Sequence, residues 1–262
     1  MGARPITLSD GRRGFAKDAP ESAIAAEAAS LEWLRVPDGP PLPAVLSHDP
    51  ARLVTAYVES ARPDPQVAEE FGRRLATMHL AGADGFGAAP PGGPQVAWFG
   101  ATRMLNKPVP EDDWATWYAR DRIEPYVRQA VDERSLTAGE SAVFDEVCTR
   151  LPQLAGPPEP QARLHGDLWS GNVLWSRDAA WLIDPAAHGG HRESDLALLA
   201  LFGCPHLERI RSAYDEASPL APGWRDRIPL HQLFPLLAHV VIFGRGYADQ
   251  AVAAAHAALR AA

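Results

Sequence analysis

The chain has 262 residues, of which 46% are hydrophobic and 22% charged, as in ordinary globular proteins. Its formal net charge is −8, which argues against nucleic acid as the main partner because phosphate-binding proteins usually carry a basic face. No window approaches the length of a membrane span, and the start has no apolar segment, so we expect no membrane partner. The only cysteines, Cys148 and Cys204, make no disulfide framework and predict a reducing cytoplasm.

The first sixty residues carry mainly strand signals. Residues 6–17 predict a hairpin around an Asp-Gly turn, and residues 52–60 predict a β-branched and aromatic strand. A helix is expected over 19–34, and the loop 37–50 contains a short extended run. The Pro-rich stretch 61–66 then breaks the chain. We therefore divide the chain there, into an N-terminal lobe, residues 1–60, and a C-terminal lobe, residues 61–262.

The second part is predicted to be mainly helical, with one small β-hairpin. The expected elements are helices over 67–80, 112–133 and 137–151, two short strands over 172–175 and 180–184, and a mostly helical remainder from residue 193. Pro125 is expected to disturb the second of these helices, because proline lacks the backbone N–H. The order of elements predicts an α+β protein with a small strand-rich lobe and a large helical lobe.

The segment LHGDLWSGNVLW, residues 164–175, places polar side chains among apolar ones. Unpaired polar groups are costly in a core, so this pattern indicates a site. Asn172 follows Asp167 by five positions, and Asp184 follows Asn172 by twelve, after two strand-like runs. This is the order of a phosphoryl-transfer loop, with Asp167 as base and Asn172 and Asp184 as Mg²⁺ ligands. Turn-capping roles would explain any one of these residues but not all three in order.

A phosphoryl-transfer site also needs a lysine on an early strand and a glutamate on the next helix. Lys17 ends the predicted hairpin, and Glu27 lies in the helix that follows. Lys17 is expected to contact the α- and β-phosphates of ATP, with Glu27 holding it in place. The strand after this helix would connect the two lobes, and the backbone at Ala56, Tyr57 and Val58 would then reach the adenine.

These motifs together resemble the fructosamine kinase, or ketosamine 3-kinase, family. The resemblance rests on LHGDLWSGN and on two longer segments, IDPAAHGGHRESDLALLALFG at 183–203 and AYDEASPLAPGWRDRIPLHQLFPLLAHVVIFG at 213–244. It implies a bilobal fold similar to aminoglycoside phosphotransferases and protein kinases. It further implies ATP, Mg²⁺ and phosphorylation of the sugar 3-hydroxyl of a ketosamine, either free or protein-bound.

Several further residues are candidates by their place beside these motifs. His165 and Asp195 are expected to orient the catalytic loop, and we group His165 with Asp167 as catalytic. Trp169, two residues after the base, is predicted to offer an indole face to the sugar or to its protonated amine. The candidate substrate-binding residues are Trp169, His188, His191, Glu193 and Trp114, with Trp117 and Tyr118 near Trp114 as a second wall. For His191, a bond to a backbone carbonyl is the equal alternative.

The start of the chain departs from the kinase pattern. Sixteen residues precede Lys17, and the hairpin uses most of them, so we expect no first strand and no glycine-rich loop over the phosphates. Either the start of the chain is shortened or the protein lacks this loop, and a loss of the loop would weaken ATP binding. Ala56 is a second departure, because the family often has an acidic residue there, but backbone recognition of adenine would survive it.

Three other classes of protein remain open at this point. One is a different small-molecule kinase, such as an aminoglycoside or choline kinase. Another is an inactive, nucleotide-binding kinase-like protein, against which the intact Asp167, Asn172 and Asp184 argue. A metallohydrolase using His165, Asp167, Asp184 and His188 is the weakest alternative, since its histidines lack a tight helical pair.

Overall fold

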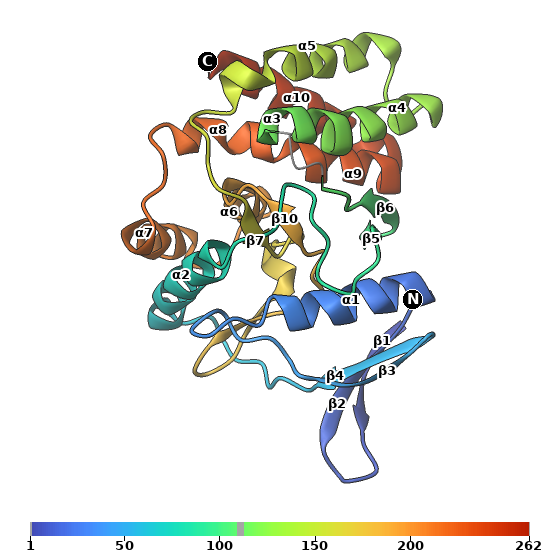
Figure 1. The fold of residues 1–262 in the computed structure, drawn as a ribbon, viewed down its shortest axis with the longest axis vertical. Helices are drawn as coiled ribbons and strands as arrows, with labels where there is room; N and C mark the ends of the chain where they lie inside the picture. Colours follow the sequence, from blue (N-terminus) through green and yellow to red (C-terminus); the bar gives the residue numbers. More distant parts are fainter. Residues whose placement is uncertain (1, 109–112, 262) are drawn as a thin grey trace.

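The computed structural model describes residues 2–108 and 113–261, and it is bilobal (Figure 1). The small lobe, blue in Figure 1, is an antiparallel sheet with one helix across it, in the strand order β1-β2-β4-β3. Its elements are β1 (Gly2–Thr7), β2 (Arg13–Asp18), α1 (Glu21–Trp33), β3 (Val45–Asp49) and β4 (Arg52–Ala56). The predicted hairpin, helix and connecting strand are all present. The extended run in the predicted loop is β3.

The β1–β2 hairpin turns where the sequence predicts it. Gly11 adopts a φ of +83°, which an L-residue rarely does, and the Asp10 carboxylate accepts a hydrogen bond from the backbone N–H of Arg12. Lys17 lies opposite Ala3 of β1 and Leu53 of β4, so it is held in a central strand. Among the described residues, one strand precedes the lysine strand.

The large lobe holds the remaining elements in four groups. Its first part contains α2 (Pro65–Leu80), the hairpin β5 (Val96–Phe99) and β6 (Thr102–Leu105), α3 (Trp114–Tyr118), the π-helical turn η1 (Ala119–Ile123), α4 (Glu124–Asp132) and α5 (Ala138–Leu154). The catalytic segment contains β7 (Ala162–Leu164), η2 (Ser170–Asn172), β8 (Val173–Trp175), β9 (Ala180–Leu182) and β10 (His188–Gly190). The helices α6 (Glu193–Leu201) and α7 (Leu207–Ala217) follow, and α8 (Trp224–His231), α9 (Leu233–Phe243), η3 (Gly244–Tyr247) and α10 (Ala248–Arg260) end the chain.

Two parts of this lobe differ from the prediction. The single helix expected over 112–133 is three pieces, α3, η1 and α4, and its first residue lies outside the described residues. Pro125 sits in the first turn of α4, where a missing N–H is tolerated, and the wider turn η1 comes just before it. The pairs β5–β6 and β7–β10 were not predicted.

The hydrophobic packing does not stop at the predicted boundary near residue 60. One cluster of buried side chains joins α1 and β4 to α2, β8, β9 and α7, and a second fills the space among α3, α4, α5, α9 and α10. Helices α2 and α7 approach very closely, because a Cβ on Gly72 would lie 2.2 Å from the carbonyl oxygen of Ile210. Only glycine permits this spacing.

The helical run Trp224–Arg260 is long and apolar enough to cross a membrane by length and composition alone, contrary to the expectation from the sequence. Its most apolar window is 56% buried inside the protein, however, and α9 belongs to the second hydrophobic cluster. Core helices of globular proteins pass the same test. We therefore describe this run as part of the core of the large lobe.

Candidate active site

The loop after β7 is held in an unusual backbone conformation. Gly166 has a φ of +81°, and a Cβ there would lie 2.1 Å from the carbonyl oxygen of Ala186. The carbonyl of His165 accepts a hydrogen bond from the N–H of Ala186 at 3.0 Å, which joins the two sides of the segment. The HGD sequence therefore needs its glycine, which lets the chain turn immediately before Asp167.

Asp167 and Asn172 lie side by side, as their spacing predicts. The amide nitrogen of Asn172 donates to the backbone oxygen of Asp167 at 2.8 Å and to its carboxylate Oδ2 at 3.1 Å. Burial raises the pKa of Asp167 to about 7, and the negative charge of Asp184 adds to this, while the bond from Asn172 opposes it. A carboxyl group with such a pKa can accept a proton near neutral pH.

Lys17, Glu27 and Asp184 also come together. The ammonium of Lys17 lies 2.6 Å from Glu27 Oε2 and 3.2 Å from Asp184 Oδ1, so β2, α1 and the end of the β8–β9 hairpin meet at one cation. Burial alone would favour neutral Lys17, but the carboxylates of Glu27 and Asp184 hold its pKa above the usual value. Asp184 adopts a φ of +52°, a sparsely populated conformation for a non-glycine residue.

A cleft of about 290 Å³ opens beside this cation, between the sheet and the β8–β9 hairpin. Apolar side chains of both lobes line it, among them Phe15, Leu53 and Leu174, and Lys17 and Asp184 close one end. Ala56, at the end of β4, and Tyr57 and Val58 after it also line the cleft. The guanidinium of Arg13 stacks on the Tyr57 ring at 3.7 Å and fixes that ring. An apolar cleft with an ammonium group beside it suits a nucleotide, because the cleft can hold the planar nucleobase and the cation can hold the phosphates.

The residues at this end of the cleft fit a magnesium ion. The side-chain nitrogen of Asn172 donates to Asp167, so the side-chain oxygen of Asn172 is available as a metal ligand. Lys17 bonds only one of the two Asp184 oxygens. Amide and carboxylate oxygens are the hard ligands that Mg²⁺ prefers, usually together with phosphate.

A buried carboxylate behind the loop holds it in place. Asp195, at the start of α6, accepts hydrogen bonds from the backbone N–H of His165 at 2.7 Å and of Gly166 at 3.0 Å. This confirms the expected bond between Asp195 and the catalytic loop. His79 Nε2 contacts the same carboxylate at 3.1 Å. Burial opposes ionisation of Asp195, but the bonds from His79 and the charges around it keep its pKa below the usual value.

His165 is fully buried, and its ring faces away from the cleft. Its Nε2 bonds the carbonyl of Ile183 at 3.0 Å, and its Nδ1 accepts the N–H of Asp167 at 3.3 Å. The side chain thus ties the loop to the residue before Asp184. His165 orients two functional residues, which agrees with the expected supporting role, and it does not reach the reacting atoms.

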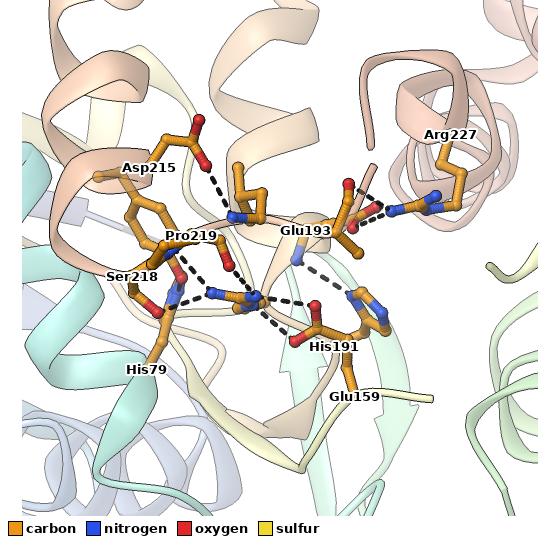
Figure 2. Close-up of polar contacts among 12 residues, drawn as sticks. His79, Glu159, His191, Glu193, Asp215, Ser218, Pro219 and Arg227 are labelled. Atoms are coloured by element: carbon orange, nitrogen blue, oxygen red, sulfur yellow. Dashed lines mark hydrogen bonds and ion pairs between the residues drawn. The ribbon is translucent and has the colours of Figure 1, made fainter. Parts of the chain in front are cut away.

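A further polar network lies between α6, α7 and α8 (Figure 2). Both Glu193 oxygens accept from the Arg227 guanidinium, at 2.6 and 2.9 Å, and Arg192 pairs with both oxygens of Glu159. Arg192 also donates to the carbonyls of Ser218 and Pro219, so it closes the turn after α7. These bonds stabilise the start of α6, which carries Asp195.

The structure corrects four of the predicted substrate-binding residues. Trp114, His188, His191 and Glu193 are between 2% and 5% exposed, so they belong to the core and cannot form the wall of an open site. Trp114 stacks on Tyr118 and lies against His191 and His231, an arrangement that buries its apolar ring. The second wall expected from Trp117 and Tyr118 fails for the same reason. Helical spacing alone does not tell a buried aromatic face from an exposed one.

The cluster of His191, Glu193 and His231 has three potential ligand atoms within 4.8 Å of one another, but its donors do not fit a metal. His191 Nδ1 accepts the N–H of Glu193, so its proton sits on Nε2 and neither nitrogen has a free lone pair. Arg227 occupies both oxygens of Glu193. The metallohydrolase alternative also needs His165, whose Nε2 bonds the Ile183 carbonyl and whose Nδ1 accepts the N–H of Asp167, so His165 has no free lone pair for a metal.

Trp169 differs from these residues because it stays 39% exposed. Its indole lies flat over Gly171, where a Cβ would come within 2.2 Å of the ring, and its edge meets Phe202 at a centroid distance of 6.1 Å. The ring therefore lies at the surface, two residues after Asp167 in the chain, where a substrate could contact it.

Sequence reasoning missed His79 and Tyr214, which anchor the loop from behind. His79 Nδ1 bonds the Tyr214 hydroxyl at 2.8 Å, and both side chains are buried. The available signal was a histidine in the apolar stripe of the 67–80 helix. A polar residue on a buried face needs a partner, but the sequence does not show which one.

A bilobal fold with a Lys–Glu pair, an Asp and an Asn side by side on one loop, and a second Asp paired with the same lysine defines a kinase-like phosphotransferase. The sequence profile of the fructosamine kinase family matches residues 12–261. The chain therefore belongs to the fructosamine kinase family, and it is a kinase that uses ATP.

Individual relatives agree with this assignment. A protein of Enterococcus faecium assigned as a ketoamine kinase is 32% identical over 202 residues, which are 76% of this chain and 69% of that protein. Mouse ketosamine-3-kinase is 36% identical over 138 residues, which are 52% of this chain and 44% of the mouse protein.

Solved structures show the same fold. A protein of Thermobifida fusca assigned as a fructosamine-3-kinase superposes with a TM-score of 0.92 at 49% identity, covering 98% of this chain and 89% of that one. An aminoglycoside phosphotransferase in complex with AMP-PNP and hygromycin B has a TM-score of 0.65 at 15% identity, covering 99% of this chain and 94% of that one. The second likeness shows the fold alone.

Proposed function

We propose that this protein transfers the γ-phosphoryl group of ATP to a sugar hydroxyl of a ketosamine, the 3-hydroxyl in the family pattern. The observation that carries the proposal is the pairing of Asp167, beside Asn172, with an exposed indole two residues away. A base beside an uncharged aromatic face suits a sugar joined to a protonated amine, because the face can contact both. A site for a polycationic aminoglycoside would be expected to present several carboxylates instead.

The residues divide the work of the reaction. Asp167 accepts the proton of the sugar hydroxyl as its oxygen forms a bond to the γ-phosphorus, while the bond from that phosphorus to the bridging oxygen of ADP breaks. Lys17, held by Glu27, neutralises the α- and β-phosphates. Asn172 and Asp184 would hold Mg²⁺, which supplies charge neutralisation on the transferred group. His165 and Asp195 position the loop and touch no substrate.

The proposed metal role of Asp184 can be tested by nucleotide binding. Asp184→Ala should weaken binding of Mg·ATP by more than tenfold and binding of metal-free ATP much less, because Mg²⁺ is held by protein and phosphate oxygens together. Calorimetric titration with and without EDTA measures both affinities. Equal losses in the two titrations would remove Asp184 from this role, and Asp178→Ala, at an exposed turn, is the matched control.

The substrate class is tested by an ADP-release assay across ketosamines, aminoglycosides and choline, with Asp167→Asn as the control for unspecific ATP hydrolysis. We expect turnover with fructosamines or ribulosamines, and mass spectrometry should place the phosphate on the 3-hydroxyl. Turnover restricted to aminoglycosides or choline would replace the proposal with the corresponding small-molecule kinase. An absence of turnover with tight nucleotide binding would indicate the inactive kinase-like protein.

Two wider expectations belong to the same proposal. Both cysteines are free, which agrees with a reducing cytoplasm. The partner is expected to be a free or protein-bound ketosamine and not a nucleic acid, given the acidic net charge.

A further inference from the structure

The exposed indole beside the base is one end of a continuous row of aromatic rings. We call this row the aromatic strip; it consists of Trp169, Phe202, His239, Phe243 and Tyr247. Successive ring centroids lie between 5.0 and 6.1 Å apart, from the catalytic loop across the end of α6 to α9 and η3. Phe243 is 62% exposed and Phe202 is 40% exposed. A connected apolar surface that starts at a catalytic loop usually marks a binding surface.

The strip is uncharged but has one polar contact to offer. His239 Nδ1 bonds the carbonyl of Pro235, so the proton is on Nδ1 and Nε2 remains an acceptor. Burial lowers the pKa of His239, which keeps the ring neutral. The surface therefore suits an apolar or aromatic group that carries an N–H donor, and a polycation or an acidic segment would find no opposite charge on it.

We propose that the aromatic strip binds the amine side of a peptide ketosamine, so that the enzyme prefers a glycated lysine flanked by apolar or aromatic residues. This inference rests on the proposed function, and the strip adds a subsite to it. The sugar lies at Asp167 and Trp169, and the lysine stem and its neighbours continue over Phe202 towards Phe243. Their backbone N–H groups meet the acceptor on His239.

The experiment compares two tripeptides with a central fructosyl-lysine, one flanked by Phe and one by Ser, together with a fructosamine of methylamine. For the native protein, KM should be about fivefold lower for the Phe peptide than for the Ser peptide. Phe243→Ser should bring that ratio close to one and leave the KM for ATP and for the methylamine compound unchanged. Leu80→Ser, at a 64% exposed leucine on α2, is the matched control and should keep the native ratio.

Each other outcome overturns the inference in a distinguishable way. An unchanged ratio in Phe243→Ser removes the strip from substrate binding, while turnover of the methylamine compound leaves the proposed function standing. A dimer in light scattering that Phe243→Ser dissociates, with unchanged ratios, would make the strip an interface between copies of the chain. If the native protein phosphorylates none of the three compounds, the proposed function itself fails, and this inference fails with it.

Discussion

The catalytic loop has two faces that differ in what surrounds them. One face, which we call the cleft face, carries Asp167, which is partly buried, and Trp169, which is 39% exposed. The core face carries His165 and is fixed by Asp195, both nearly inaccessible, through backbone hydrogen bonds at 2.7 and 3.0 Å. The cleft face is free to react because the core face supplies the rigidity. Substitutions on the two faces should therefore affect different measurements.

The largest effect is expected on the core face. Asp195→Ala should lower the free energy of unfolding by about 3–5 kcal/mol, because it leaves two backbone N–H groups and His79 without their buried partner. Chemical denaturation measures the loss. Asp195→Asn keeps one acceptor oxygen and should recover part of it. A loss below about 1 kcal/mol in the alanine variant would show that the loop does not depend on this anchor.

Asp167→Asn is the matched change on the cleft face. Turnover should fall roughly a hundredfold or more, in line with the usual contribution of a general base, while nucleotide affinity and unfolding free energy stay near the native values. Steady-state kinetics with calorimetry and denaturation separates the three quantities. Turnover within a few-fold of the native rate would take Asp167 out of the reaction.

The buried histidine His188, in β10 behind the catalytic loop, should contribute to the response to acid. Burial, with the nearby charge of Arg122, lowers the pKa of His188 from 6.5 to about 3, so below pH 6.5 the unfolded chain binds a proton that the folded chain refuses. Stability should therefore fall as the pH drops from 6.5 towards 3, with a contribution of up to about 1.4 kcal/mol per pH unit.

Denaturation at several pH values measures this slope. His188→Asn should make the pH dependence of the unfolding free energy shallower, by up to the contribution of one bound proton. The exposed His256 provides the control, because its imidazole meets water in both the folded and the unfolded chain. If His188→Asn and His256→Asn change the slope equally, the buried histidine is not its source.

The smallest effect is expected at Trp169. Trp169→Ala should raise the KM for ketosamines about fivefold, the equivalent of about 1 kcal/mol for an exposed cation–π contact, and leave the KM for ATP unchanged. A half-exposed ring should cost little stability. If the variant instead loses several kcal/mol with a normal KM, Trp169 is a packing residue and the two faces are less distinct than the structure indicates.

The two faces also differed in how well the sequence predicted them. Asp167, Asn172, Asp184, Lys17 and Glu27 were predicted because their chemistry requires particular residue types in a fixed chain order, and the structure brings them together. Each of their motifs lies in one short stretch of the chain and can be recognised there, although Lys17 meets Asp184 across 167 positions. Strand and helix periodicity predicted a strand-rich part followed by a helical part, and the resemblance to the fructosamine kinase family implied the bilobal fold.

The core face was harder to predict, because its partners come from distant segments. His79 meets Asp195 across 116 positions of sequence, and no local pattern pairs them. His191 and Glu193 stand beside the catalytic segment in sequence but point into the core, so closeness in sequence suggested substrate contact wrongly. The strand β10 consists of His188, Gly189 and Gly190, and glycine is depleted in strands, so its sequence gave no strand signal.

The close approach of α2 and α7 makes one glycine a spacer for the active site. Gly72 lies seven residues before His79, which is two turns along the same face of α2, and Ile210 lies one turn before Tyr214 on α7. The distance between the helix axes therefore also sets how far His79 reaches towards Asp195. A methyl group added at position 72 would wedge the helices apart and loosen the loop from behind. A substitution at position 72 would then affect catalysis, although this position lies about 10 Å along the helix from His79.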